Sequence, residues 1–299
     1  MSKETNIKWT ESTWNPVTGC SKISAGCKNC YALRDWPKLA SKENSVYFGR
    51  KFTDIMFHMD RLDQPIRWKK PRKIFVNSMS DLFHESLDFD TIDKVFMSMI
   101  VANWHTYQVL TKRPDIMVNY INDRLPIIKE KMRNLKDYFT EEQFKMNPEL
   151  KNFDIESIKI PFDHIWLGTS VEDRKAAETR LPLLKEVKKY SSVAWVSAEP
   201  LVEPYSLDGY AENIDWFVLG GESGPKARIM KEEWVKDFIS DCSKYNVPFL
   251  FKQWGEFAPV NGVMTKIGVD AAGDLIDGIN YADYPVIEKE ITEKKKFSI

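Results

Sequence analysis

Short runs of apolar residues recur along the chain, each closed by polar or glycine residues and followed by a helical pattern. This alternation predicts βα units that build a parallel sheet. A first, ill-defined run lies around 12–17. The clearer runs, rich in β-branched and aromatic residues, are Lys73–Asn77, Tyr107–Thr111, His164–Gly168, Val193–Ser197, Asp215–Leu219 and Val247–Phe251.

Helical patterns occupy the stretches between these runs. In 91–102 the apolar residues recur at steps of three and four, and 232–245 carries a similar apolar stripe. About seven βα units in one chain predict an α/β fold of the TIM barrel type. The (βα) barrel is complete or partial, and an open doubly wound sheet is the alternative.

Two segments depart from this rhythm. Residues 114–161 hold more helix than a crossover needs and are highly charged, which predicts a helical insertion over the barrel at about 121–160. A solvated surface helix and a functional lid are both open interpretations of this insertion. The tail from Gly262 shows no further βα unit, and its glycines suggest a small hairpin. We therefore expect a barrel domain over 1–261 and a C-terminal extension over 262–299.

Composition narrows the class of protein. The 299 residues, 43% hydrophobic and 29% charged, can bury one large core or two small ones. The chain has 43 Lys and Arg residues and 44 Asp and Glu residues, so it carries no overall positive charge that would indicate nucleic-acid binding. No run approaches the roughly 18 apolar residues of a membrane span, and no signal peptide opens the sequence. We expect a soluble cytoplasmic protein that does not bind membranes.

Three cysteines gather near the N-terminus. Cys20, Cys27 and Cys30 account for all but one of the four in the chain, and Gly19 and Gly26 each directly precede a cysteine. A flexible loop of this kind lets three thiolates turn toward one point. A disulfide would leave an odd thiol in the loop and would need an oxidising compartment. The spacing therefore predicts a metal site.

Zinc and an iron–sulfur cluster compete for this site, since C-x-x-C is also a zinc half-site. Structural zinc needs a fourth ligand, but the histidines are scattered singly and Cys242 lies far away in a predicted amphipathic helix. Three thiolates without an evident fourth ligand fit an iron–sulfur cluster with one open iron better than a closed zinc site.

Polar residues follow the predicted strands. The carboxyl ends of the strands carry the active site in barrels and open α/β sheets. Because Ser, Asp and Glu also cap helices, each residue alone is weak evidence, whereas the set is stronger. The candidates for cofactor binding are Ser78, Ser80, Asp81, Lys112, Thr169, Ser170, Ser197, Glu199 and Glu222.

Two of these motifs point to ligand chemistry. The glycines of Gly220-Gly221-Glu222 allow close approach of a ligand, and the carboxylate can receive an ammonium or a ribose hydroxyl; a tight turn with a solvated Glu222 is the alternative. Lys112-Arg113 before Pro114 could clamp a carboxylate or phosphate, or could be a surface pair that starts a helix.

At this point the residues resemble a known family. The sequence is similar to the phage- and mobile-element-associated three-cysteine radical-SAM-like family of the radical S-adenosylmethionine superfamily, whose reaction is not established. The resemblance covers most of the chain up to about Gly255. The motifs that carry it are Trp14–Cys20, Gly26–Ala32, Leu110–Pro114, Gly168–Glu172, Ser197–Leu201, Gly220–Gly224 and Lys252–Gly255.

The superfamily implies a [4Fe–4S] cluster on Cys20, Cys27 and Cys30. The open iron would chelate S-adenosylmethionine, whose reductive cleavage yields a 5′-deoxyadenosyl radical that abstracts hydrogen from the substrate. The resemblance also implies an electron donor of the flavodoxin or ferredoxin type. The substrate is unknown, and a nucleic acid or modified base is the favoured class.

Two departures limit what the resemblance implies. The usual cysteine spacing is three then two, whereas here it is six then two. The usual Gly-Gly-Glu follows the second strand, so here Ser78, Ser80 or Asp81 would receive the ammonium and Glu222 would be open to substrate. The alternative function is a metal-stabilised protein, with zinc or a cluster, that binds nucleic acid through 67–73 without catalysis.

Overall fold

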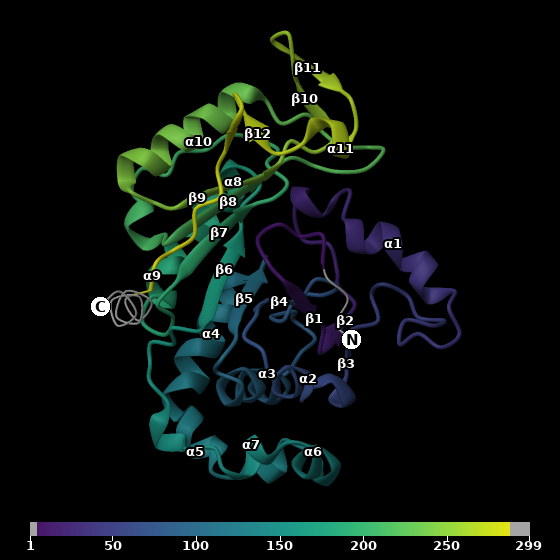
Figure 1. Ribbon diagram of the computed structural model, residues 1–299, viewed down its shortest axis with the longest axis vertical. Coiled ribbons are helices and arrows are strands. Elements are labelled where there is room, and N and C mark those ends of the chain that lie inside the picture. Colours follow the sequence, from purple (N-terminus) through teal and green to yellow (C-terminus); the bar gives the residue numbers. More distant parts are fainter. Residues whose placement is uncertain (1–4, 288–299) are drawn as a thin grey trace.

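The computed structural model describes residues 5–287, and its centre is a seven-stranded sheet (Figure 1). All neighbouring strands are parallel, and their order in space is their order along the chain. They are β1 (Ser12–Trp14), β4 (Lys73–Val76), β5 (Thr106–Thr111), β6 (Ile165–Ser170), β7 (Ala194–Ala198), β8 (Trp216–Gly220) and β9 (Phe249–Gln253). β1 and β9 are edge strands that do not pair with each other, so the barrel is not closed. The sheet is a curled half-barrel, which confirms the partial form of the predicted barrel.

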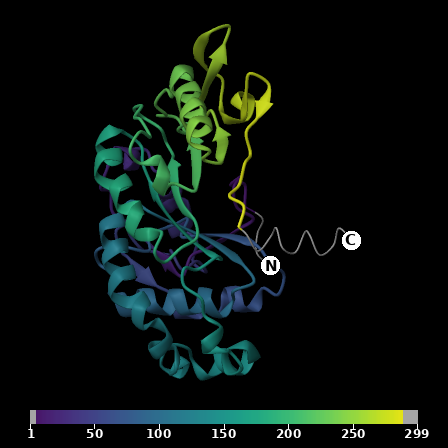
Figure 2. The same cartoon turned by 90° about the vertical axis from the view of Figure 1, so that its left-hand side faces the viewer.

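Helices cover the convex face of this sheet (Figures 1 and 2). Ile74 and Val76 of β4 share a large core with Val95 and Phe96 of the following helix. The connecting helices are α2 (Gln64–Arg67), α3 (Phe89–Val101), α4 (Pro114–Arg124), α8 (Arg174–Arg180), α9 (Leu184–Val187) and α10 (Glu232–Tyr245). Helix α1 (Tyr31–Ala40) instead follows the cysteine loop.

A separate cluster of aromatic side chains fills the amino end of the concave face. Trp166, Trp195 and Trp216 are buried here, and Trp9 packs on Trp195 with ring centroids 5.3 Å apart. Gly168 makes room for this cluster, since a Cβ there would lie 2.5 Å from the Trp195 ring. The interior of the half-barrel is therefore closed at one end and open at the carboxyl ends of the strands. This arrangement, with a concave core of its own, differs from a doubly wound sheet.

The insertion consists of short helices, α5 (Ile128–Met132), α6 (Glu141–Met146) and α7 (Pro148–Lys151). A capping box of Thr140 and Gln143 starts α6. The same Gln143 side chain donates to the Met59 carbonyl at 2.8 Å, and Asn147 donates to Asp63 at 2.9 Å. The insertion thus packs on the segment around α2. No residue of 114–160 lines the cavity described below, and the place of the insertion over the barrel stays a prediction.

The remaining elements are small. A short pair, β2 (Val17–Thr18) and β3 (Met56–Phe57), frames the cysteine loop. After β9 the chain forms two hairpins where the sequence suggested one. The first pairs β10 (Phe257–Val260) with β11 (Val263–Lys266), and the second pairs β12 (Leu275–Ile276) with β13 (Ile279–Asn280); α11 (Val269–Ala272) lies between the two hairpins.

Within 5–287 no helix has the length and apolar character of a membrane span. The end of the predicted extension, 288–299, lies outside the described residues.

Candidate functional site

A cavity of about 780 Å³ opens at the carboxyl ends of the strands, between the concave face of the sheet and the cysteine loop. The predicted site residues that line it are Cys20, Cys27, Cys30, Ser78, Ser80, Asp81, Lys112, Ser170, Ser197, Glu199 and Glu222. One candidate is misplaced: Thr169 does not line the cavity, and its buried hydroxyl donates to the Thr111 carbonyl at 3.0 Å. Side chains alternate along β6, so Trp166 and Ser170 face the concave side, whereas Thr169 has the opposite parity.

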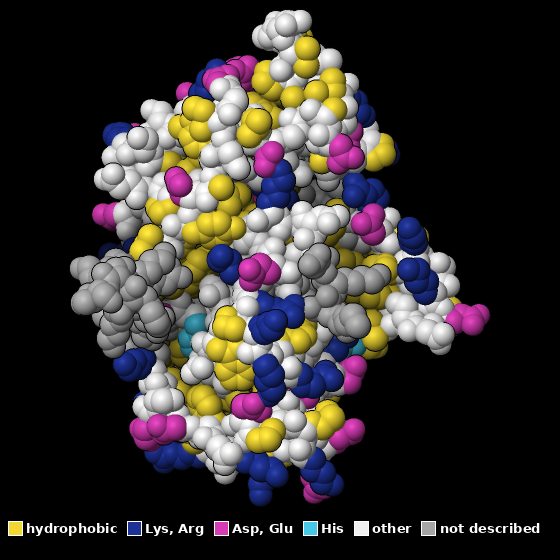
Figure 3. Space-filling model, viewed as in Figure 1, with side chains coloured by type: hydrophobic (Ala, Val, Ile, Leu, Met, Phe, Trp, Pro, Cys, Tyr) yellow, Lys and Arg dark blue, Asp and Glu magenta, His cyan; other side chains and the backbone are white. Residues whose placement is uncertain are grey.

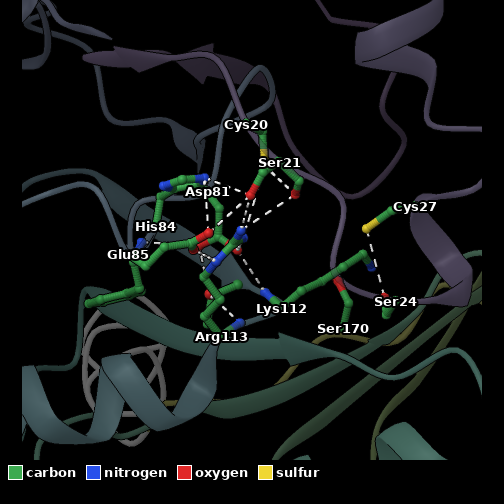
Figure 4. A network of polar contacts seen from close by, with 12 residues as sticks. Cys20, Ser21, Ser24, Cys27, Asp81, His84, Glu85, Lys112, Arg113 and Ser170 are labelled. Atoms are coloured by element: carbon green, nitrogen blue, oxygen red, sulfur yellow. Dashed lines mark hydrogen bonds and ion pairs between the residues drawn. The ribbon is translucent and has the colours of Figure 1, made fainter. Parts of the chain in front are cut away.

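The three cysteines are free thiols on one wall of this cavity. Cys20 and Cys30 both pack against the small apolar cluster of Trp36 and Phe52. Cys27 ends a short 3-10 helix, η1 (Ala25–Cys27), and its Sγ lies 3.7 Å from the Ser24 hydroxyl (Figure 4). The loop therefore places the three thiols along one cavity, and their convergence on a single point stays a prediction.

The thiols fit an iron–sulfur cluster by their chemistry. As their side chains are placed, residues 5–287 contain no group of three or more His, Cys, Asp or Glu that could hold a metal ion, so ligation by the three cysteines stays a prediction. Burial, with the charge of Asp81, raises the pKa of the Cys20 thiol to about 12. Since a metal ligand is a thiolate, metal binding here would release that proton. No described histidine lines the cavity, so the donors beside the three thiols are oxygen atoms of carboxylates such as Asp35 and Glu256.

Beneath Cys20 lies a buried arginine (Figure 4). Arg113 follows β5, and its side chain donates to Ser21 Oγ at 2.7 Å and to Asp81 Oδ2 at 3.2 Å, and pairs with Glu85. Burial alone would lower the pKa of Arg113, but Glu85 and Asp81 raise it. The guanidinium is thus a permanent positive charge that joins the cysteine loop to the ends of β4 and β5.

The carboxylate of Asp81 is fully engaged within the fold. Oδ1 accepts from Phe83 N at 3.0 Å and Thr111 Oγ1 at 2.6 Å, while Oδ2 accepts from Lys112 N at 3.0 Å and from Arg113. A carboxylate has about four such lone-pair positions. Asp81 therefore positions the strand ends and has little capacity left for a ligand.

Ser78 and Ser80 also bond within the fold. The Ser80 hydroxyl donates to the Val17 carbonyl at 2.9 Å, and the Ser78 hydroxyl bonds to the Asn15 side chain at 3.0 Å. Both serines thus tie the segment after β4 to the strands that precede the cysteine loop. Their neighbour Asn77 is different: it lines the cavity and is buried, yet neither polar atom of its side chain has a hydrogen-bond partner among the described residues.

Lys112 extends an ammonium group into the cavity. Its Nζ lies 3.8 Å from Oε2 of Glu172, a wholly buried carboxylate that also pairs with Arg180 at 2.9 Å. Burial alone would raise the pKa of Glu172, but Lys112 and Arg180 hold it below its usual value. Glu172 accepts from the Gly26 backbone N–H at 3.2 Å, and a Cβ at Gly26 would come within 3.0 Å of this side chain. The glycine before Cys27 is therefore required by this close approach.

Two further carboxylates lie on the far side of the cavity. Glu222 forms a bidentate pair with Arg228, at 2.6 and 2.9 Å, and accepts from Asn29 of the cysteine loop at 3.0 Å. Glu199 accepts from the Trp9 indole at 3.1 Å and pairs with Lys252.

Sequence reasoning missed the partners of these groups. Arg228 lies outside every motif. Asn29 lies inside the Gly26–Ala32 motif, but nothing in the sequence indicates that it bonds to Glu222. Asn77 follows a strand as a polar residue, and only its lack of a partner among the described residues distinguishes it.

Comparisons with known proteins give a family and two weak structural likenesses. The family model described as "Protein of unknown function (DUF5131)" matches residues 4–285. No curated protein matches the chain. Spore photoproduct lyase complexed with dinucleoside spore photoproduct has a TM-score of 0.37 and 11% identity, with 82% of this chain and 75% of that chain covered. A mutant of spore photoproduct lyase has a TM-score of 0.40 and 9% identity over the same shares.

Proposed function

The chain belongs to this family, whose description leaves the reaction open, and we propose that it is an iron–sulfur enzyme that reductively cleaves S-adenosylmethionine. The observation that carries the proposal is the cavity itself: three free cysteines of one loop and the polar ends of the strands line a single space. A [4Fe–4S] cluster on these thiols would supply the electron that breaks a carbon–sulfur bond of the sulfonium.

Lys112 is the residue that we assign to a carboxylate of the bound ligand. It is a flexible point charge and its side chain is 19% exposed. Its one ion-pair partner within 5–287, Glu172, is 3.8 Å away and already paired with Arg180. The ammonium can therefore turn toward the cavity without leaving Glu172 unpaired. The pair with Arg180 also keeps Glu172 charged, which fixes Gly26 beside Cys27.

Glu199 and Ser197 are suited to ribose hydroxyls. Ser197 donates to Glu199 at 3.4 Å, and Lys252 balances the carboxylate charge, so both oxygens are held in place while part of their bonding capacity stays open. Glu222 is less suited to substrate than the sequence suggested, because Arg228 and Asn29 occupy its carboxylate.

For the substrate we propose a nucleic acid or a modified base. Lys22 lines the cavity and is exposed, so it can contact a phosphate of such a substrate, whereas Arg34 at the same opening pairs with Asp35. Basic and acidic side chains alternate over the face shown in Figure 3, in keeping with a local contact and not a strong nonspecific one.

The segment 67–73, which carried the binding-protein alternative, does not line the cavity. Several of its basic side chains have partners within the fold: Arg67 with Asp63, Lys69 with Glu149, and Lys73 over the Tyr284 ring. The observations therefore favour the enzyme.

The test is anaerobic reconstitution with iron and sulfide, followed by dithionite and S-adenosylmethionine. We expect a brown protein with about four irons per chain, which forms 5′-deoxyadenosine and methionine. Alanine at Cys20, Cys27 or Cys30 should remove the iron, whereas Cys242→Ala, in α10, should retain it. Lys112→Ala should keep the iron and bind S-adenosylmethionine more weakly. Stoichiometric zinc without iron, or a loaded protein that makes no 5′-deoxyadenosine, would refute the proposal.

A further inference from the structure

The amide of Asn77 is an unsatisfied donor and acceptor inside the cavity. The residue is 2% exposed, lines the cavity, and neither Nδ2 nor Oδ1 has a hydrogen-bond partner within the described part of the chain. Buried polar groups are almost always paired, and an unpaired one costs free energy. A group that belongs to a ligand would explain why this amide is retained.

The surroundings of Asn77 separate it from its neighbours. Ser78, Ser80 and Asp81 each bond to other parts of the fold, so the amide is the unassigned polar group at the end of β4. Phe75 lies two residues earlier, on the same side of the strand, in the concave aromatic cluster. Its ring contacts Trp9 with centroids 4.7 Å apart, and both residues line the cavity.

The chemistry of an amide decides which ligand fits. Asn offers one N–H donor and one carbonyl acceptor side by side, so a ligand that satisfies both must present an adjacent acceptor and donor. An ammonium donates only, and would leave Nδ2 unpaired. The edge of adenine has this pattern, and Asn pairs with it in bidentate fashion. The apolar floor of Trp9, Phe75 and Leu110, all cavity residues, suits the face of such a ring.

We propose that Asn77 binds the edge of an adenine-type base in this cavity. Two sources share this chemistry: the adenine of S-adenosylmethionine and a base of a nucleic-acid substrate. The inference deepens the proposed function by naming a ligand group and its contact. It rests on the cavity and the amide, and needs no metal.

The experiment measures nucleoside binding to the full-length protein by calorimetry, without metal and after anaerobic loading. The probes are adenosine and purine riboside, which lacks the exocyclic amino donor. We expect adenosine to bind about tenfold or more tightly than purine riboside. Asn77→Ala should weaken the binding of adenosine by about tenfold and that of purine riboside by less, because purine riboside keeps the ring-nitrogen acceptor but has no amino donor for Oδ1.

Two further variants serve as controls for this result. Asn77→Asp keeps the size of the side chain but presents two acceptors, so it should lose adenosine affinity in the same way even if the alanine variant folds poorly. The exposed Asn44, changed to Ala, is the matched control and should bind both nucleosides as the unaltered protein does.

Competition separates the two sources of the base. If S-adenosylmethionine displaces adenosine and also binds more weakly to the Asn77→Ala protein, the base is that of the cofactor. If adenosine binds a protein saturated with S-adenosylmethionine and still depends on Asn77, the base is that of a substrate. Adenosine binding that is absent, or equal in the Asn77 variants, would overturn the inference and leave an ordered water as the partner of the amide.

The failure of the inference can be told from the failure of the proposed function. Asn77-dependent adenosine binding by a protein that never cleaves S-adenosylmethionine would retain the base site and refute the enzyme. Cleavage of S-adenosylmethionine by a protein whose adenosine binding does not depend on Asn77 would support the enzyme and refute the base site.

Discussion

Arg113 places its guanidinium against the sulfur of Cys20, with Nη1 4.0 Å from Sγ. The same nitrogen bonds to the buried Asp81, so the cation is fixed by the strand ends and not by the loop alone. A fixed positive charge beside a thiol favours its ionised form and opposes the effect of burial. Burial and the charge of Asp81 outweigh this effect, so Arg113 only offsets part of the rise in the pKa of Cys20.

Replacement of Arg113 should destabilise the whole fold. Arg113→Met leaves Asp81, whose side chain is 7% exposed, without its cation. Loss of one partner from a buried ion pair costs about 3–5 kcal/mol. We expect a decrease of that order in the free energy of unfolding, measured by urea titration of the metal-free protein. The exposed Arg34, changed to Met, is the control and should alter stability by less than about 1 kcal/mol; equal effects of the two changes would contradict the buried role of Arg113.

His58 should make stability fall in mild acid. Burial lowers the pKa of His58 to about 4, whereas an unfolded histidine titrates near 6.5. Between these values the unfolded chain binds the additional proton, so stability decreases as the pH falls from about 6.5 to 4. The contribution is about 3 kcal/mol by linkage. His58→Gln should reduce the dependence of unfolding free energy on pH in this window, to which His84 and His105 also contribute because burial lowers the pKa of each. An unchanged slope would show that His58 does not contribute.

Replacement of Gly168 by a residue with a side chain should destabilise the fold. A Cβ there would lie 2.5 Å from the Trp195 ring, and overpacking of this kind costs about 1–3 kcal/mol. We expect Gly168→Ala to lower the thermal midpoint of the metal-free protein. In a Trp195→Phe background the smaller ring makes room, so the cost of Gly168→Ala should decrease. Additive effects of the two changes would mean that the glycine and the ring do not meet.

Arg228 should control the mobility of the cysteine loop. Its side chain donates to the Ala25 carbonyl at 3.0 Å and holds Glu222, which accepts from Asn29. Arg228→Ala should therefore speed amide hydrogen exchange in 25–30 more than in the strands of the sheet. The exposed Lys231, changed to Ala, should leave that exchange as it is. If Arg228→Ala instead raises exchange evenly over the chain, the contact is not a local one.

The strands could be predicted because most of their residues are buried. The run His164–Gly168 became β6 (Ile165–Ser170), every residue of which is buried, and the other runs shifted by similarly small amounts. Such continuous apolar runs are the signal of a parallel sheet. The insertion was harder to place, because helices as short as α7, of four residues, have little periodicity and their position depends on tertiary contacts such as Asn147 with Asp63.

The site could be predicted as a set but not residue by residue. Parallel strands bring their carboxyl ends together, so the cysteine loop and the strand-end residues meet in one cavity. A shift by one residue moves a side chain to the other face, which is why Ser170 enters the cavity and Thr169 does not. Hydrogen-bond partners distant in sequence are invisible to such reasoning: Asp81 looks like a ligand group until its four donors are seen.

The bond between Asn29 and Glu222 joins residues 193 positions apart. During synthesis the three cysteines leave the ribosome long before β8 and the carboxylate that fixes their loop. A nascent chain that stops short of β8 holds every thiol of the motif and lacks Glu222, Arg228 and the last two strands of the seven-stranded sheet. The contacts that hold the cysteine loop are therefore complete only after β8 and Arg228 have been made, and we expect a C-terminal truncation before β8 to remove them while the cysteine motif remains intact.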